Sequence, residues 1–504
     1  MRKKYCASKK NYKSFFIFFC FFCYLLYTFS VAYSIPCNSD MANMVLEAED
    51  IIHGNLFLRD WILTGITFFT TDLIFFEIGT AFFGISNFAY VFSIWLMWLS
   101  LIAAGCLFFF DLCPKEKRWY LLPLFLTICA FPCKEFIMHS RVHTGSAFFA
   151  LLGIFFARKA AATERKIHFI LCGLSLVFAT AGDISGLLTG ILPIVLVFSV
   201  KSYRSIVSEG KTIKNKYSII VAVVVAAFIC AIILEKLWLF LGGADKNAYI
   251  GEKSFLPISE WQNHLTIYFD GLFSLVDAHF MGEHIGSFQT LIALFRSSII
   301  IAGLCTMFFH ILKFLRNQTH DETIVLLSTS FCAISAVYIL TSLSINIWTT
   351  RYFAYTPVIF ALVISRQVVT LQKIPMNKKA VRSICAFCSL FLICASVLHN
   401  GSNIRIFFDK QSRSKIGKDS ERLELANFLT AQGLSNGYAT FWDASILTVY
   451  SKNKVKVRHL NADGTQMKWF CKNTWYSEPA NFIIANGIDQ NEIARRFGDR
   501  KSVV

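Results

Sequence analysis

Eleven long apolar stretches constrain the fold of this chain more than any other feature of its sequence. A helix needs about 20 apolar residues to cross the hydrocarbon core of a bilayer, and fewer where the bilayer is thin or distorted. Apolar residues make up 55% of the chain, more than a water-soluble fold of this size can bury. We therefore predict an all-α polytopic membrane protein with about eleven transmembrane helices. The candidate spans are residues 14–34, 87–110, 119–133, 143–157, 167–181, 185–200, 217–237, 290–312, 323–343, 352–371 and 383–398.

The placement of positive charge predicts the orientation of these spans in the cell membrane. The predicted cytoplasmic segments carry 25 Lys and Arg residues, whereas the predicted short outer segments carry 6. Cytoplasmic loops are enriched in Lys and Arg, so this bias places the N-terminus in the cytoplasm and, after an odd number of spans, the C-terminus outside. Because the net charge of +17 is confined to short clusters between apolar stretches, we expect the lipid bilayer and not nucleic acid as a partner.

The chain divides into a membrane domain, residues 1–399, and a C-terminal domain, residues 400–504. The membrane domain has two long outer loops, 35–86 and 238–289, and the first contains an apolar stretch, 63–84, that is interrupted by Asp72 and Glu77. We interpret this stretch as an interfacial or re-entrant helix. The C-terminal domain alternates helical and strand patterns, which predicts a small extracytoplasmic α/β domain. Its expected elements are a helix over 419–433 that ends at Gly433, strands over 454–460 and 481–487, and a helix over 489–498.

The start of the first outer loop, residues 39–55, has the pattern of an amphipathic helix. Its apolar residues recur at helical spacing, and Asp40, Asn43, Glu47 and Asp50 form the opposite stripe, with Ser39 able to cap the helix and Gly54 able to end it. In the first turn Asp40 would be ionised near neutral pH, because free N–H groups favour a carboxylate there, and it would be able to accept a proton. Alternatively, these acids form the solvated face of an outer loop.

Basic residues stand at the outer edges of two predicted spans. Arg141 and His143 lie in RVHTG, before the fourth span, and Arg351 begins RYFAYTP, at the tenth. The planar guanidinium group of arginine matches the geometry of a phosphate. Alternatively, these side chains anchor the spans by reaching the headgroups. Asp183 lies in the turn between two short spans, where a charge marks either function or a solvated turn.

The sequence lacks the motifs of several common enzyme classes. It contains no GxxxxGK[ST], GxSxG or HExxH, and no group of Cys and His residues has metal-ligand spacing. ATP-driven transport and zinc hydrolysis are therefore disfavoured, and we expect no metal or other cofactor.

A combination of segments resembles a known class of enzyme. A basic N-terminus and one span lead into SDMANMVLEAEDIIHGNLFLRDW and FFTTDLIFFEIGTAFFG, followed by many spans, RYFAYTP and an outer α/β domain. This arrangement resembles bacterial membrane glycosyltransferases of the GT-C fold, relatives of protein mannosyltransferases and lipid A aminoarabinose transferases. The resemblance implies transfer of a sugar from a polyprenyl-phosphate carrier to an acceptor on the outer face of the membrane, which is a cell-envelope glycan, a lipid or a protein.

The resemblance also implies roles for individual residues. The carboxylate that activates the acceptor maps onto Asp40, and Asp72 or Glu47 is the candidate for an assisting acid. The adjacent acidic pair of protein mannosyltransferases is missing, because Asp40 stands between Ser39 and Met41.

The donor phosphate would be held by basic residues at the outer ends of spans, which implies Arg141, His143 or Arg351. We predict that Arg141 or Arg351, assisted by His143, shares a polar site with Asp40, because a phosphate beside the acids of the first outer loop needs cations between them.

Two other functions fit a polytopic membrane protein. A transporter or lipid flippase for envelope precursors is the first alternative, although internal repeats and broken midplane helices are not evident. A non-catalytic scaffold of the envelope is the second, and it would lack a polar site under the first outer loop.

Overall fold

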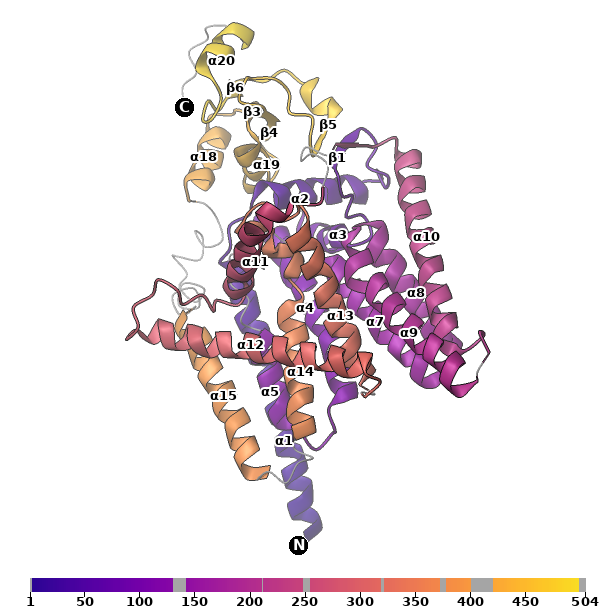
Figure 1. Ribbon diagram of the computed structural model, residues 1–504. Coiled ribbons are helices and arrows are strands. Elements are labelled where there is room, and N and C mark those ends of the chain that lie inside the picture. Colours follow the sequence, from indigo (N-terminus) through magenta and orange to yellow (C-terminus); the bar gives the residue numbers. More distant parts are fainter. Residues whose placement is uncertain are drawn as a thin grey trace.

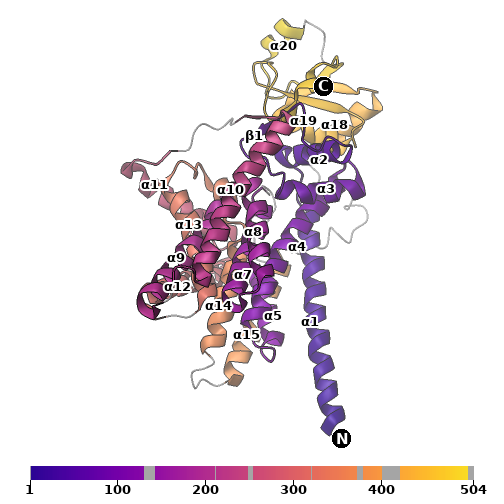
Figure 2. The ribbon, with the colours of Figure 1, turned by 90° about the vertical axis from the view of Figure 1, so that its right-hand side faces the viewer.

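The computed structural model describes most of the chain as a bundle of helices with a small α/β unit at one end (Figure 1). Figures 1 and 2 place the start of the first helix and the α/β unit at opposite ends of the molecule. The described residues are 2–129, 142–210, 212–247, 254–318, 321–371, 378–399 and 420–497.

Each of the eleven apolar stretches contains a helix. The sequence also determines where these helices begin and end: the side chain of Asn215 accepts hydrogen bonds from the N–H groups of Tyr217 and Ser218 at the start of α10, and Gly243 takes φ +61° just after its end. The bundle helices are α1 (Arg2–Tyr33), α4 (Asn87–Leu112), α5 (Arg118–Cys129), α7 (Thr144–Thr163), α8 (Lys166–Ala181), α9 (Leu192–Glu209, preceded by a π-helical turn η1, Leu187–Ile191), α10 (Lys216–Gly242), α12 (Phe288–Leu315), α13 (Glu322–Leu340), α14 (Thr356–Leu371) and α15 (Lys378–His399).

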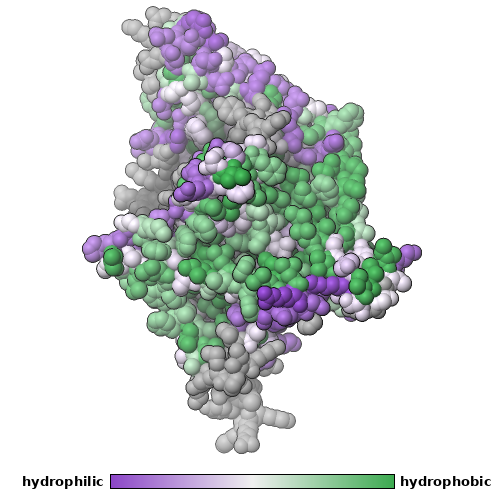
Figure 3. All heavy atoms as spheres, in the orientation of Figure 1, coloured by the Kyte–Doolittle hydropathy of each residue, from purple (hydrophilic) through white to green (hydrophobic). Residues whose placement is uncertain are grey.

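The lengths and composition of these helices are those of a membrane-embedded protein. Within the described residues, 8 helices are long and apolar enough to cross a bilayer. The three remaining predicted spans are shorter apolar helices, Arg118–Cys129, Lys166–Ala181 and Ala380–Cys394, so eleven crossings stay a prediction. Figure 3 shows hydrophobic atoms over the middle of the molecule, with hydrophilic atoms over the α/β unit and again near the ends of α9 and α12.

Ion pairs connect the helices at the end of the bundle remote from the α/β unit. Asp111 of α4 pairs with Arg158 and Lys159 of α7, and Asp321 pairs with Arg366 of α14 at 2.6 Å. Lys201 of α9 and Glu322 of α13 form a further pair. These residues come from the segments that the charge pattern assigns to the cytoplasm, so the structure brings those segments to one end of the bundle.

The opposite end contains the first outer loop, which forms α2 (Ser39–Ile52), β1 (Trp61–Thr64) and α3 (Asp72–Phe83). Strand β1 pairs in parallel with β2 (Asp245–Asn247) of the second long loop and antiparallel with β5 (Cys471–Lys472) near the C-terminus. One small sheet thus joins both long loops to the α/β unit. The second loop continues as a short 3-10 turn, η2 (Ile258–Glu260), and α11 (Trp261–Leu275).

The α/β unit contains the predicted helices and strands together with four elements that the sequence patterns did not indicate, β3, α19, β5 and the 3-10 turn η4. Its parallel sheet has the order β4-β3-β6, and helix α18 ends at Ala431, shortly before Gly433. The division of the chain into domains at residue 400 stays a prediction. The unit consists of α18 (Ser420–Ala431), β3 (Asn436–Thr440), α19 (Phe441–Tyr450), β4 (Lys456–Leu460), β5, a 3-10 turn η4 (Asn473–Tyr476), β6 (Phe482–Ile483) and α20 (Gln490–Phe497).

Helix α2 forms as predicted, but its surroundings differ from the expected solvated face. Asn38, and not Ser39, caps the helix, since its side chain accepts a hydrogen bond from the N–H group of Met41. Asn43 and Glu47, on the polar stripe, are buried because α19 packs over α2. The helix is therefore covered on both faces, by the bundle and by the α/β unit.

Candidate functional site

Asp40 lies in the first turn of α2, at the junction between the bundle and the α/β unit. The residue as a whole is partly exposed. Burial among the surrounding protein atoms raises the pKa of Asp40, and the positive charge of Arg351 acts in the opposite direction. The prediction from the helix dipole alone, that Asp40 is readily ionised, thus omitted the effect of burial. A carboxylate with a raised pKa is a better proton acceptor once it is ionised.

Arg351 and Tyr352 come from η3 (Ile347–Phe353), the turn that precedes α14. The guanidinium carbon of Arg351 lies 5.9 Å from the ring centre of Tyr352. The Nε atom of Arg351 is buried and has no hydrogen-bond partner in the described part of the chain, which leaves this donor for a ligand. Arg351 is thus a cation held close to Asp40 with an unused hydrogen-bond donor.

His143 and Asp183 form a buried ion pair beside Tyr352. The ring centres of His143 and Tyr352 are 4.3 Å apart, and Nδ1 of His143 lies 2.6 Å from Oδ2 of Asp183. Both side chains of the pair are at most 4% exposed. His143 adopts φ +79° just before α7, a backbone conformation that costs a non-glycine residue about 1–3 kcal/mol and that occurs preferentially at functional sites.

Asp72, the first residue of α3, lies next to this ion pair and is fully buried. Its Oδ1 atom accepts a hydrogen bond of 3.3 Å from the N–H group of Gly145, whereas Oδ2 has no partner among the described residues. Burial and the negative charge of Asp183 raise the pKa of Asp72 to about 8, despite hydrogen bonds that lower it. Asp72 therefore carries a proton at neutral pH.

The two neighbouring carboxyl groups have opposite pKa shifts. Burial alone would raise the pKa of Asp183, but the charge of His143 and hydrogen bonds from His143 and Ser185 lower it below the usual value. Asp183 is consequently an ionised acceptor beside Asp72, a protonated donor. Pairs of acids whose environments separate their pKa values are typical of sites that perform acid–base chemistry.

A glycine allows α3 and α7 to meet closely at this point. A Cβ atom on Gly145 would lie 2.6 Å from the carbonyl carbon of Thr71 and 2.8 Å from the nitrogen of Asp72. Only glycine permits this approach without displacing the start of α3. The HTG sequence after Arg141 thus places the backbone N–H group of residue 145 on the Asp72 carboxyl group.

The α/β unit holds both ends of α2. Near its N-terminus, the hydroxyl group of Ser445 donates a hydrogen bond of 2.8 Å to Oδ1 of Asn43, whose amide group in turn donates to the carbonyl group of Ser39. Near its C-terminus, Oδ2 of Asp50 accepts a hydrogen bond of 2.7 Å from Lys472. Although burial opposes it, the hydrogen bonds to Asp50 lower its pKa, so Asp50 is an ionised structural partner and not a candidate base. The α/β unit thus fixes the helix that carries Asp40.

Of the predicted site residues, Asp40, Asp72, His143 and Arg351 converge through a continuous series of contacts and electrostatic interactions. Arg141 falls outside the described residues. Glu47 is buried farther along α2. Burial raises the pKa of Glu47, and the charged residue that raises it further is Asp50. The structure therefore does not connect Glu47 to this cluster.

The sequence patterns gave no role to Tyr352. For Asp183 they left two interpretations open, a functional charge or a residue of a solvated turn. The position of Tyr352, directly after Arg351, is a signal that could have identified it. The electrostatic interaction between Asp72 and Asp183 joins residues more than a hundred positions apart, and no local sequence pattern indicates it.

No group of three or more His, Cys, Asp and Glu side chains in the described residues is arranged to hold a metal ion. Comparison of the chain with family models returned no match, and no curated protein matches it.

Proposed function

We propose that this protein is a membrane glycosyltransferase of the GT-C type that moves a sugar from a polyprenyl-phosphate carrier to an acceptor on the outer face of the membrane. The observation that carries the proposal is the cluster formed by Asp40, Arg351, Tyr352, the His143–Asp183 pair and Asp72. It combines a carboxylate of a partly exposed residue, a cation with an unused donor and a protonated acid, at the end of a bundle of membrane-spanning helices.

The chemistry of an inverting transfer fits these groups. Asp40 accepts the proton of the acceptor hydroxyl group while the hydroxyl oxygen attacks the anomeric carbon of the sugar. The bond between that carbon and the phosphate oxygen breaks, and the electron pair stays on the phosphate. Arg351 stabilises the negative charge on the departing polyprenyl phosphate, since a cation aimed at developing charge lowers the barrier. No metal ion is required for this sequence of steps.

Asp72, Asp183 and His143 act in positioning and electrostatics. Protonated Asp72 is a neutral acid, so it places no second negative charge beside ionised Asp183. Ionised Asp183 holds His143, and the His143 ring packs on Tyr352, the neighbour of Arg351. This arrangement fixes the cation relative to Asp40.

The orientation that we propose follows from the same charge bias as before. Eleven crossings with a cytoplasmic N-terminus put the cluster, both long loops and the α/β unit outside the cytoplasm, where a carrier lipid presents its sugar. A reporter enzyme that is active only outside the cytoplasm, fused after Val504, should be active. Activity of a cytoplasm-specific reporter at the same position would contradict this orientation.

The experiment that tests the function uses the purified full-length protein in vesicles with radiolabelled polyprenyl-phosphate sugars. We expect label to move from the lipid carrier to a non-carrier acceptor. If the label instead crosses to the other leaflet while it remains on intact carrier, the protein is a flippase.

A further inference from the structure

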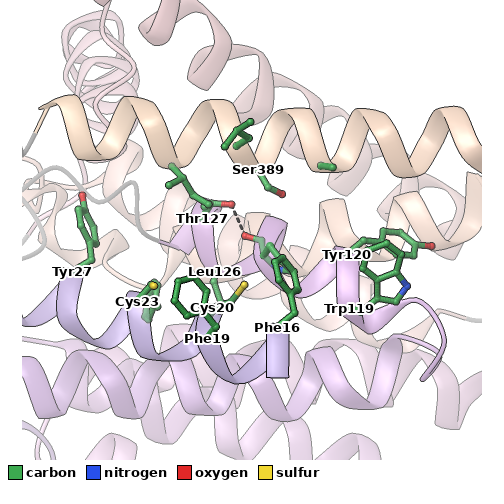
Figure 4. A pocket seen from close by; sticks show the side chains of 15 residues that line it. Phe16, Phe19, Cys20, Cys23, Tyr27, Trp119, Tyr120, Leu126, Thr127 and Ser389 are labelled. Atoms are coloured by element: carbon green, nitrogen blue, oxygen red, sulfur yellow. Dashed lines mark hydrogen bonds between the residues drawn. The ribbon is translucent and has the colours of Figure 1, made fainter. Parts of the chain in front are cut away.

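A cavity of about 390 Å³ lies between three helices of the bundle, remote in sequence from the Asp40 cluster. Helices α1 and α15 both pack against α5, which forms the floor of the cavity, and Figure 4 shows α1 and α15 on its two sides. Its volume is in the range of small-molecule sites. Trp119 and Tyr120 stand at one end of the cavity and Tyr27 and Cys23 at the other (Figure 4).

The lining of this cavity suits hydrocarbon. It is formed almost entirely by apolar and aromatic side chains, and the hydroxyl groups of Thr127, Ser389 and Tyr24 form hydrogen bonds within the protein. Thr127 donates a hydrogen bond to the carbonyl group of Pro123, and Ser389 donates to that of Cys385 at 2.7 Å. The hydroxyl oxygen of Tyr24 accepts a hydrogen bond from the indole of Trp98. Since none of these groups needs a partner from an occupant, the occupant is apolar along the length of the cavity.

The end with Trp119 and Tyr120 has a positive charge. Arg382 lies on α15 one turn before Ala386, which lines the cavity, and its guanidinium carbon is 5.9 Å from the ring centre of Tyr120. Arg382 is exposed, and it forms no ion pair with the described residues. Tryptophan, tyrosine and arginine together are typical of the level of lipid headgroups, so an aromatic and cationic end adjoins an apolar interior.

From this geometry we infer that the cavity binds one acyl chain of an anionic phospholipid, with the lipid phosphate against Arg382. An acyl chain matches the paired, apolar lining, and a phosphate matches the planar guanidinium group at the end of the cavity. A neutral phospholipid carries a compensating positive charge beside its phosphate and gains less from Arg382. The site is separate from the proposed transfer reaction, and its test does not depend on activity.

Trp119 reports on the occupant, because bromine atoms on an acyl chain quench tryptophan fluorescence only at contact. The full-length protein is mixed in detergent micelles with phosphatidylglycerol that has dibrominated acyl chains, or with the same chains on phosphatidylcholine. The signal of Trp119 is the difference between the natural protein and the Trp119→Phe variant. We expect both lipids to quench Trp119 saturably. Half-maximal quenching should require a mole fraction of phosphatidylglycerol about fivefold lower than the mole fraction of phosphatidylcholine, which is the effect of one basic residue at a lipid surface.

Two variants separate the headgroup from the chain. Arg382→Gln should abolish the fivefold preference while leaving quenching itself, and Ala386→Phe should fill the cavity and remove the saturable quenching by both lipids. Equal quenching by the two lipids in the natural protein, an unchanged preference in Arg382→Gln or unchanged quenching in Ala386→Phe would overturn the assignment. Displacement of the brominated lipid by unlabelled polyprenyl phosphate at a lower mole fraction than by phosphatidylglycerol would assign the cavity to the carrier and not to bulk lipid.

Discussion

Replacement of Asp72 with asparagine should change how the stability of the protein depends on pH. The pKa of this carboxyl group rises from 3.8 in the unfolded chain to about 8 in the folded protein. Because the folded-state pKa is the higher one, the protonated group contributes stability that is fully present below about pH 4 and is lost as the pH rises through about 8. Asparagine has the same size, can accept the same hydrogen bond from Gly145 and does not titrate.

The size of the effect follows from this shift. Each pH unit well between the two pKa values changes the free energy of unfolding by about 1.4 kcal/mol, and the change becomes smaller near pH 8, so the natural protein loses about 2 kcal/mol relative to Asp72→Asn between pH 6 and pH 8. Since about 1 kcal/mol moves the melting temperature of a domain of 150–250 residues by about 2–4 °C, and that of a chain of 504 residues by about half as much, the variant should gain about 2–4 °C on the natural protein.

Thermal unfolding of both purified proteins in one detergent, followed by intrinsic fluorescence at pH 6, 7, 8 and 9, measures this gain. Asp50→Asn is the matched control, because the pKa of Asp50 is lowered and its contribution changes only in acid, as the pH falls through that lowered value. The control should therefore lower the melting temperature by a similar amount at every pH from 6 to 9. If the curves of Asp72→Asn and the natural protein run parallel over this range, Asp72 is not a buried protonated acid and the reasoning is wrong.

Three further predictions concern the neighbours of Asp40. Arg351→Gln should lower kcat for sugar transfer about 100- to 1,000-fold, which is the usual effect of removing one hydrogen-bond donor to a developing negative charge. An unchanged kcat in steady-state kinetics would contradict the assignment of Arg351 to the donor phosphate. His143→Asn and Asp183→Asn should each lower the free energy of unfolding by about 3–5 kcal/mol. Asparagine is chosen at position 143 because it tolerates the backbone conformation at φ +79°. In a double-mutant cycle measured by denaturation, the double variant should lose far less stability than the sum of the losses in the two single variants. Lys472→Met should lower kcat with little change in KM, because it removes the hydrogen bond by which the α/β unit holds Asp50 of α2. If donor binding falls as much as kcat does, the variant is generally misfolded instead.

The helical bundle was predictable because each membrane span is a continuous apolar stretch, which can be recognised in the sequence without knowledge of its neighbours in the fold. Hydrophobic length alone located a helix in each of the eleven stretches, and the two ends of α10 follow from Asn215 at its start and Gly243 just after its end. The shorter apolar helices in α5, α8 and α15 leave the number of crossings open, since length does not separate a short span from a helix buried in the bundle.

The candidate site was predictable only in part. Periodicity located α2 and placed Asp40 in its first turn, but a helical wheel cannot show that α19 covers the polar stripe, because that contact joins residues 402 positions apart. For the same reason the sequence indicated neither the raised pKa of Asp72 nor its pairing with Asp183. Both arise from burial and from a charge contributed by a distant turn.

The most direct test of the proposed function is label transfer by Asp40→Asn beside the natural protein. With radiolabelled polyprenyl-phosphate sugar as donor, the natural protein should transfer label, and the asparagine variant should be slower by about 100- to 10,000-fold, the range for loss of a general base. Glu47→Gln, which replaces a carboxyl group with an amide on the same helix outside the cluster, is the control and should retain most of the activity. A rate for Asp40→Asn close to that of the natural protein, or a loss of activity in Glu47→Gln alone, would contradict the assignment of Asp40 as the base.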